Sequence, residues 1–208
     1  MKKLLTTFGI LCMAHHFVLA QSSGATWANL ELGYGWTLAD KGKYDLANVS
    51  DKMYMAIFHF KLRYYVTDAV SLAAGVGVTP YSNYDITTVP VFAGLQYDFS
   101  RIPRLFAYAD VGFPLSAETS SNDFLSSWLA DYSVSYVSGV VANAGVGYRI
   151  AYSERRSLYV ALGYHLFRYG LSINFLNGVS DEQLSDKRAK HAILLRVGYT
   201  FDVKKIFD

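Results

Sequence analysis

Hydrophobic and polar residues alternate strictly along most of the chain after residue 26. This period of two places every second side chain on the same face of a β-strand. Eight segments show it, separated by polar or turn-forming stretches: 27–38, 53–66, 70–79, 88–99, 104–114, 139–151, 157–168 and 190–201. The pattern predicts eight strands, each with one apolar face and one polar face.

The two faces differ strongly in composition. The apolar faces contain no charged or amide residue; taking every second residue, they run Ala28–Leu38, Tyr54–Val66, Val70–Val78, Val89–Phe99, Leu105–Phe113, Val140–Ile150, Leu158–Leu166 and Ile193–Phe201. The opposite faces carry ten of the sixteen glycines together with Glu31, His59, Lys61, Arg63, Gln96, Asp98, Asp110, Asn143, Arg149, His165 and Arg196.

Alternation alone does not say which face points outward, because a soluble lipocalin-like barrel is also exported and eight-stranded. A soluble barrel needs its polar face in water, and glycine is a poor choice for an exposed strand face. Inside a narrow eight-stranded barrel, by contrast, small residues leave room for a few long charged side chains. We therefore expect the polar face to line the lumen and the apolar face to contact lipid.

Aromatic residues and connection lengths support the membrane arrangement. One rim of the predicted barrel carries Tyr64, Tyr97, Phe99, Tyr148, Tyr199 and Phe201, and the other carries Tyr34, Trp36, Tyr54, Phe113 and Tyr164. Two such girdles are expected at the two membrane interfaces. The connections after the second, fourth and sixth strands are short, and those after the first, third, fifth and seventh are longer, which predicts periplasmic termini.

Residues 1–20 have the features of a secretory signal peptide. Lys2 and Lys3 precede an apolar stretch, and Val18-Leu19-Ala20 forms a small-residue cleavage site. The predicted organisation is a signal peptide at 1–20 and one barrel domain at 21–208. Without the two lysines, basic and acidic residues balance at 17 each, so charge gives no reason to expect nucleic acid as a partner. The single cysteine lies within the signal peptide, and export without disulfides suits a bacterial envelope protein.

Seven charged residues on the polar faces form the candidate functional constellation. They are Glu31, Lys61, Arg63, Asp98, Asp110, Arg149 and Arg196. Ionised groups in a narrow lumen must be paired or hydrated, so these residues predict a salt-bridged plug; a small polar pore or gated proton path is the alternative.

No cofactor or metal is expected. The Gly-x-Gly pairs lie inside strands and open no helix, so they do not form a phosphate-binding loop. His59, His165 and His191 lack the local spacing of metal ligands.

The signal peptide, the eight strands, the alternating connections and the final segment Arg196-Val-Gly-Tyr-Thr-Phe201 together resemble the small outer-membrane barrels of the OmpA/OmpX and opacity-protein type. The resemblance implies an all-β, eight-stranded antiparallel up-and-down transmembrane barrel. It also implies a monomer in the outer membrane of a Gram-negative bacterium, in contact with lipopolysaccharide and phospholipid. In this family an aromatic residue ending the last strand is read by the barrel-insertion machinery, a part that Phe201 or Phe207 would take here.

The same resemblance implies a non-enzymatic role in envelope integrity or in surface contact through the long loops. Two loops have helical signals, an apolar face in 122–130 and a capping box at 180–183. An enzymatic alternative is similar to the lipid A-modifying barrels of the PagL and PagP types, with His165 and Ser172 near a membrane rim. The His-x-Ser-Asn arrangement of the deacylases is absent.

Overall fold

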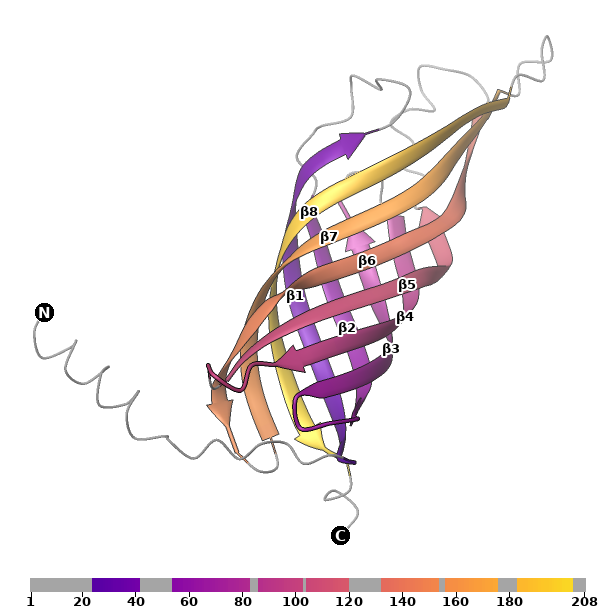
Figure 1. The fold of residues 1–208 in the computed structure, drawn as a ribbon. Helices are drawn as coiled ribbons and strands as arrows, with labels where there is room; N and C mark the ends of the chain where they lie inside the picture. Colours follow the sequence, from indigo (N-terminus) through magenta and orange to yellow (C-terminus); the bar gives the residue numbers. More distant parts are fainter. Residues whose placement is uncertain are drawn as a thin grey trace, which may run out of the picture.

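The computed structural model describes residues 24–41, 54–82, 86–102, 104–119, 132–153, 156–175 and 183–203. Their strands are β1 (Thr26–Lys41), β2 (Tyr54–Tyr65), β3 (Val70–Tyr81), β4 (Ile86–Asp98), β5 (Leu105–Thr119), β6 (Tyr132–Tyr152), β7 (Arg156–Phe175) and β8 (Gln183–Asp202). Each strand pairs antiparallel with the next in sequence, and β8 pairs with β1 to close the barrel (Figure 1). The predicted all-β, eight-stranded antiparallel barrel is confirmed.

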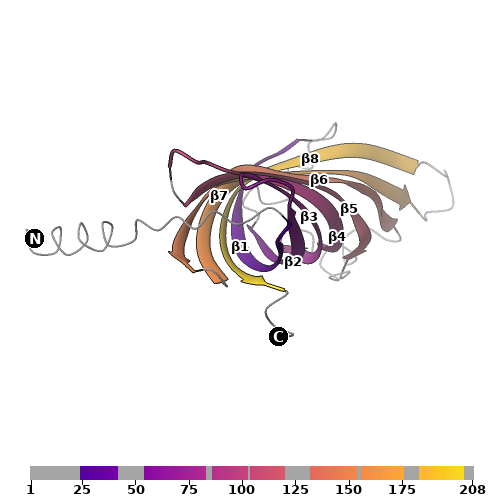
Figure 2. The same ribbon diagram turned by 60° about the horizontal axis from the view of Figure 1, so that its bottom comes forward.

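Closure brings the two ends of the described chain to the same rim. The β1–β8 ladder runs from the pair of Trp27 and Asp202 to the pair of Lys41 and Ala189, with one bulge after Thr37. Beyond it, the Val203 amide donates a hydrogen bond of 3.1 Å to the carbonyl oxygen of Thr26. Figure 2, in which this rim comes forward, shows the strands surrounding one closed ring. Along this ladder the facing edges of β1 and β8 are paired, so the backbone groups there are satisfied within the barrel.

Three strands extend furthest beyond the predicted segments, although β1 and β5 are also longer than predicted. β6, β7 and β8 span 21, 20 and 20 residues, whereas β2 and β3 span 12. The extra residues continue the β6–β7 ladder to the pair of Tyr132 and Phe175 and the β7–β8 ladder to the pair of Asn174 and Gln183. These extensions lie furthest from the rim that carries the two ends of the described chain (Figure 1). The apolar alternation stops there, because a strand that leaves the apolar belt no longer needs an apolar face.

One expected loop asymmetry is wrong. β3 ends at Tyr81 and β4 begins at Ile86, so this connection is no longer than the one between β2 and β3. The hairpin is extended by pairing of Pro80 with Thr87 and of Tyr81 with Ile86. The connections after β1, β5 and β7 are the longer ones, as expected.

Several sequence predictions concern residues outside the described part of the chain. They are the signal peptide at 1–20, the helical signal at 122–130, most of the capping box at 180–183, whose Gln183 begins β8, and Phe207. The described residues contain no helix that is long and apolar enough to span a membrane.

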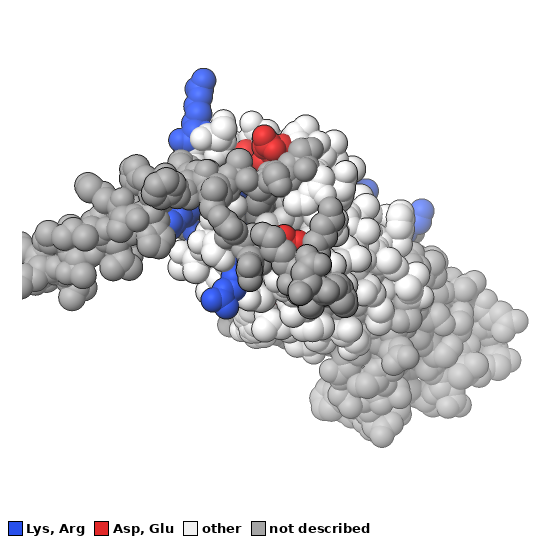
Figure 3. All heavy atoms as spheres, turned by 90° about the horizontal axis from the view of Figure 1, so that it is seen from below, with Lys and Arg blue, Asp and Glu red and all other residues white. Residues whose placement is uncertain are grey.

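The apolar lanes face outward and the polar lanes face the lumen. Outward side chains such as Leu32 and Phe113 are 61% and 62% exposed, while Lys61 and Arg196 in the lumen are each 1% exposed. Ala28 is an exception, since it belongs to an apolar lane but is buried. Seen from below, lysine and arginine side chains project at a few points around the rim, and most of the remaining described surface is uncharged (Figure 3).

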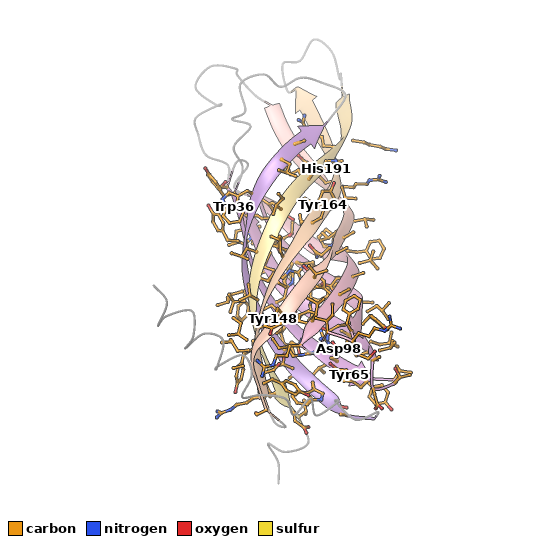
Figure 4. All side chains as sticks on the ribbon, turned by 60° about the vertical axis from the view of Figure 1, so that its left-hand side comes forward. Trp36, Tyr65, Asp98, Tyr148, Tyr164 and His191 are labelled. Carbon is orange, nitrogen blue, oxygen red and sulfur yellow. The ribbon has the colours of Figure 1, made fainter. Side chains whose placement is uncertain are left out.

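Aromatic residues mark two levels on the outer surface. Tyr34 packs on Trp36 and Tyr54 at centroid distances of 5.0 and 5.7 Å, and at the opposite rim Tyr97 packs on Phe99 at 5.2 Å. Figure 4 shows Trp36 and Tyr164 at the upper level and Tyr148 at the lower one. The wall between the two levels is the apolar belt.

The lumen as the candidate functional site

Four charged side chains meet in the middle of the lumen. Glu31 comes from β1, Lys61 from β2, Asp110 from β5 and Arg196 from β8. The Lys61 ammonium lies 3.0 Å from Glu31 Oε2 and 2.7 Å from Asp110 Oδ2. Arg196 Nη1 lies 3.1 Å from each of the same two oxygens. We call this arrangement, in which each cation bridges both carboxylates, the charge quadrangle.

The charge quadrangle is neutral overall and is supported by rings. Tyr159 donates a 2.6 Å hydrogen bond to Glu31 Oε1, the carboxylate oxygen that the cations leave free. The Arg196 guanidinium lies 4.6 Å from the centre of the Tyr108 ring, and the Lys61 ammonium lies 5.1 Å from that of Phe92. Pairing, hydrogen bonding and cation–π contacts together offset the desolvation of four buried charges.

The glycines of the polar lanes make room for large side chains from neighbouring strands. A Cβ at these positions would come closer than van der Waals contact to an inward side chain. The pairs are Gly75 and Gly112 with Phe92, Gly147 with Phe106, Gly145 and Gly163 with Tyr108, and Gly198 with Tyr159. The sequence suggested that glycine makes room for charged side chains. Among the charged residues described, only Asp110, opposite Gly94, shows this arrangement.

A second polar cluster lies toward the rim that carries the ends of the chain. Arg149 Nη2 lies 2.7 Å from Asp98 Oδ1, and the hydroxyl of Tyr65 donates to Asp98 Oδ2 at 3.0 Å (Figure 4). The side-chain amide of Gln96 donates to Asp98 Oδ1 at 2.8 Å, and the Arg149 guanidinium lies 5.2 Å from the Phe106 ring centre. This cluster joins β2, β4 and β6 in the lower lumen.

Arg63 is the one predicted network residue without a carboxylate partner in the part of the chain that is described. Its guanidinium donates to Gln96 Oε1, and its Nε has no hydrogen-bond partner there. The structure thus divides the seven predicted residues into the charge quadrangle, the Asp98–Arg149 pair, and Arg63, which bonds to the side-chain amide of Gln96.

Above the charge quadrangle the lumen is filled mainly by aromatic and aliphatic side chains. The two ring nitrogens of His165 are engaged, Nε2 with the Tyr81 hydroxyl at 3.0 Å and Nδ1 with Asn143 Oδ1 at 2.7 Å. Phe167 stacks on Tyr81 at 5.1 Å and on Tyr169 at 5.0 Å. This cluster also contains Met55, Ile57, Val141, Ala192 and Leu194.

The sequence reading missed the aromatic residues of the lumen. Phe92, Tyr108 and Tyr159 occupy polar-lane positions, so counting every second residue from Gln96, Asp110 or His165 would have found them. Tyr169 lies beyond the predicted end of its strand, and only continued alternation past 168 could have placed it inside.

One hydroxyl, one imidazole and one carboxylate lie in sequence within the described lumen. Thr79 Oγ1 lies 3.5 Å from His59 Nε2, and His59 Nδ1 lies 3.9 Å from Glu31. This order resembles a hydroxyl–imidazole–carboxylate relay, but the distances are long and all three residues are buried. Within the described residues, no three His, Cys, Asp or Glu side chains are arranged to hold a metal ion.

Comparisons with known proteins agree with the barrel fold. No protein-family model matches the chain, and no curated protein matches it. Among solved structures, the outer membrane protein OprG from Pseudomonas aeruginosa matches with a TM-score of 0.51 at 15% identity, over 88% of this chain and 99% of that chain. At this identity the likeness concerns the fold, which is that of an outer-membrane β-barrel.

Two further solved structures superpose less well. A de novo designed transmembrane β-barrel has a TM-score of 0.41 at 17% identity, over 89% of this chain and 100% of that one. An outer membrane channel from Pseudomonas putida F1 has a TM-score of 0.31 at 12% identity, over 88% and 98% of the two chains.

Proposed function

We propose that this chain is a monomeric bacterial outer-membrane barrel of the OmpA/OmpX and opacity-protein type, exported by its N-terminal signal peptide, with periplasmic termini and no enzymatic activity. Its role is envelope integrity or surface contact through the long connections after β1, β5 and β7. The lipid-facing apolar belt between two aromatic levels supports the membrane location. The observation that carries the proposal is the lumen, which side chains fill at three successive levels.

The filled lumen favours a scaffold over a pore. The charge quadrangle joins β1, β2, β5 and β8 across the barrel, the Asp98–Arg149 pair lies below it, and the cluster around Tyr81 and Phe167 lies above it. An eight-stranded barrel is just wide enough for side chains to fill. We expect the purified protein to give no conductance steps in a planar lipid bilayer.

A conductance measurement tests the sealed lumen directly. The matched pair of variants is Lys61→Ala with Arg196→Ala, which removes both cations of the charge quadrangle, and Val76→Ala with Leu162→Ala, which alters only the outer wall. We expect current from the first variant alone. Steady current through the unmodified protein would overturn the sealed-lumen proposal in favour of the pore.

Gel migration tests the membrane barrel independently of conductance. An outer-membrane fraction is run without boiling and after boiling. We expect a compact, fast band that slows on boiling, because a closed barrel stays folded in detergent until it is heated. Equal mobility, or recovery of the protein from the soluble periplasm, would overturn the proposal in favour of a soluble barrel.

The lipid-modifying alternative receives little support from His165. Both of its ring nitrogens hold hydrogen bonds inside the lumen, so neither is available as a base toward a hydroxyl nucleophile. The masses of lipid A from cells with and without the protein test this point. We expect equal masses; a difference in acyl chains that Ser172→Ala abolishes would establish the enzyme instead.

A further inference from the structure

The outer surface of β7 and β8 carries three basic side chains just beyond the upper aromatic level. We call Arg168, Lys187 and His191 the basic patch. Their lane faces outward, because the intervening residues Phe167, Tyr169, Arg188 and Lys190 are buried. At the extracellular end of the barrel, none of the other outward side chains that the structure describes is charged.

The register brings the basic patch together around two small residues. Arg168 lies opposite Ala189, and Lys187 lies opposite Gly170. Lys187 and His191 are therefore the two diagonal neighbours of Arg168 on the same face, about 7–8 Å away across the ladder. Ala189 and Gly170 carry at most a methyl group, so neither side chain separates the three basic residues.

The three basic side chains are not used by ion pairs within the described chain. Arg168 and Lys187 are exposed and have no hydrogen bond or ion pair with described residues. The Tyr164 hydroxyl and His191 Nδ1 form a hydrogen bond, which fixes the imidazole beside the upper aromatic level (Figure 4). The Nε2 of His191 has no such bond to the described residues.

An apolar groove lies directly below the basic patch. Its volume is about 330 Å³, and its outward lining is Ala109, Val111, Ala142, Ala144, Tyr164 and Leu166. Leu166 pairs with Ala142 on one side and with His191 on the other, and Arg168 pairs with Val140, so groove and patch are contiguous. The alanines of β5 and β6 create the hollow, and Tyr164 and Leu166 form its wall on β7.

We propose that this surface binds a phosphorylated, acylated glycolipid of the outer leaflet, with a phosphate on the basic patch and an acyl chain in the groove. The proposal rests on the proposed outer-membrane function. Guanidinium and ammonium groups donate strong, charge-assisted hydrogen bonds to phosphate oxygens. Arg168 is four residues beyond Tyr164, about 13 Å along the strand, which places it at headgroup depth above the aromatic level.

The test is native mass spectrometry of the full chain folded in neutral detergent, titrated with lipid A that carries two phosphates. We expect one retained lipid per barrel and an affinity about 25-fold lower for Arg168→Gln with Lys187→Gln, since each basic side chain near an anionic lipid contributes roughly fivefold. The matched control is Arg101→Gln with Arg156→Gln, which removes two exposed arginines at the opposite rim and should bind normally.

The groove has its own pair of variants. Ala144→Leu fills the hollow and is expected to weaken retention, whereas Ala74→Leu alters an exposed outward alanine of β3 outside the groove and is expected to leave it unchanged. Equal retention by the Ala144→Leu and Ala74→Leu variants would overturn the acyl-chain part of the proposal.

Three ligand arms distinguish the sources of phosphate. Lipid A without phosphates and free inorganic phosphate should both bind weakly, and phosphatidylglycerol should bind less tightly than diphosphorylated lipid A. The proposal would be overturned if the Arg168→Gln, Lys187→Gln variant bound lipid A as tightly as the unmodified protein does. It would also be overturned if free phosphate or phosphatidylglycerol bound as tightly as diphosphorylated lipid A. The unboiled gel band is recorded for every variant. A variant that loses lipid binding but keeps the compact band is still folded, so its loss of binding is assigned to this site. Absence of the compact band from the unmodified protein would refute the membrane barrel itself.

Discussion

Replacing Lys61 by Met removes one cation from the charge quadrangle and keeps a side chain of similar length. Glu31 and Asp110 then share Arg196 alone, and the buried cluster changes from neutral to a net charge of −1. Lys61 is 1% exposed, and it is the closest cation to Asp110, at 2.7 Å.

The expected cost follows from this geometry. Removing one partner of a buried ion pair costs about 3–5 kcal/mol, because an uncompensated charge is left behind. We expect Lys61→Met to lower the free energy of unfolding by about 3 kcal/mol, the lower end of this range, since Arg196 still contacts both carboxylates. Adding Asp110→Asn restores neutrality, so the double variant should be at least about 2 kcal/mol more stable than additivity predicts.

Urea unfolding of the barrel in lipid vesicles measures these values, with the compact unboiled band as the measure of folded protein. The cycle comprises the unmodified chain, the two single variants and the double variant. Arg101→Met, at an exposed position on the rim, is the control and should change stability by less than about 0.5 kcal/mol. Additive single effects, or a Lys61→Met variant as stable as the control, would refute the view that the four charges act as one unit.

Three other variants test separate parts of the barrel. Gly198→Val forces a side chain into the Tyr159 ring and should cost about 1–3 kcal/mol by urea unfolding; adding Tyr159→Ala should recover part of the cost, and no recovery would contradict the paired packing. Val76→Lys places a charge in the lipid-facing belt and should destabilise the barrel by about 2–4 kcal/mol, so an unchanged urea midpoint would argue against lipid contact there. Arg149→Ala leaves Asp98 without its cation, so hydrogen exchange of the lower ends of β4 and β6 should accelerate while the middle of the barrel stays protected.

The alternation of side chains predicted the strands and divided each into two faces, and the glycine content, the aromatic girdles and the connection lengths predicted which face points outward. The sequence alone assigns Leu32 to one face and Glu31 and Gly33 to the other, because a period of two is unambiguous once one face is apolar. The same logic failed at the upper ends of β6, β7 and β8. There the strands leave the apolar belt, and backbone pairing continues without the hydrophobic signal.

The arrangement within the lumen was less accessible from sequence. Knowing that a side chain faces the lumen does not identify the strand whose side chains it contacts, since that depends on strand register and barrel stagger. Glu31 and Arg196 are 165 positions apart, yet they meet because β1 pairs with β8. Arg63 shows the same limit, because nothing in its neighbouring residues indicates that, within the described part of the chain, it bonds to Gln96 and to no carboxylate.

The seam between the first and last strands has a consequence for assembly. Glu31 and Arg196 belong to the strands that meet only when the cylinder closes, and Asp110 arrives from the far wall. An open, half-inserted sheet would hold these charges apart, each needing water in a setting that has little. Full neutralisation therefore comes only when the final strand joins the first, so we expect partly closed barrels to be disfavoured relative to the closed one.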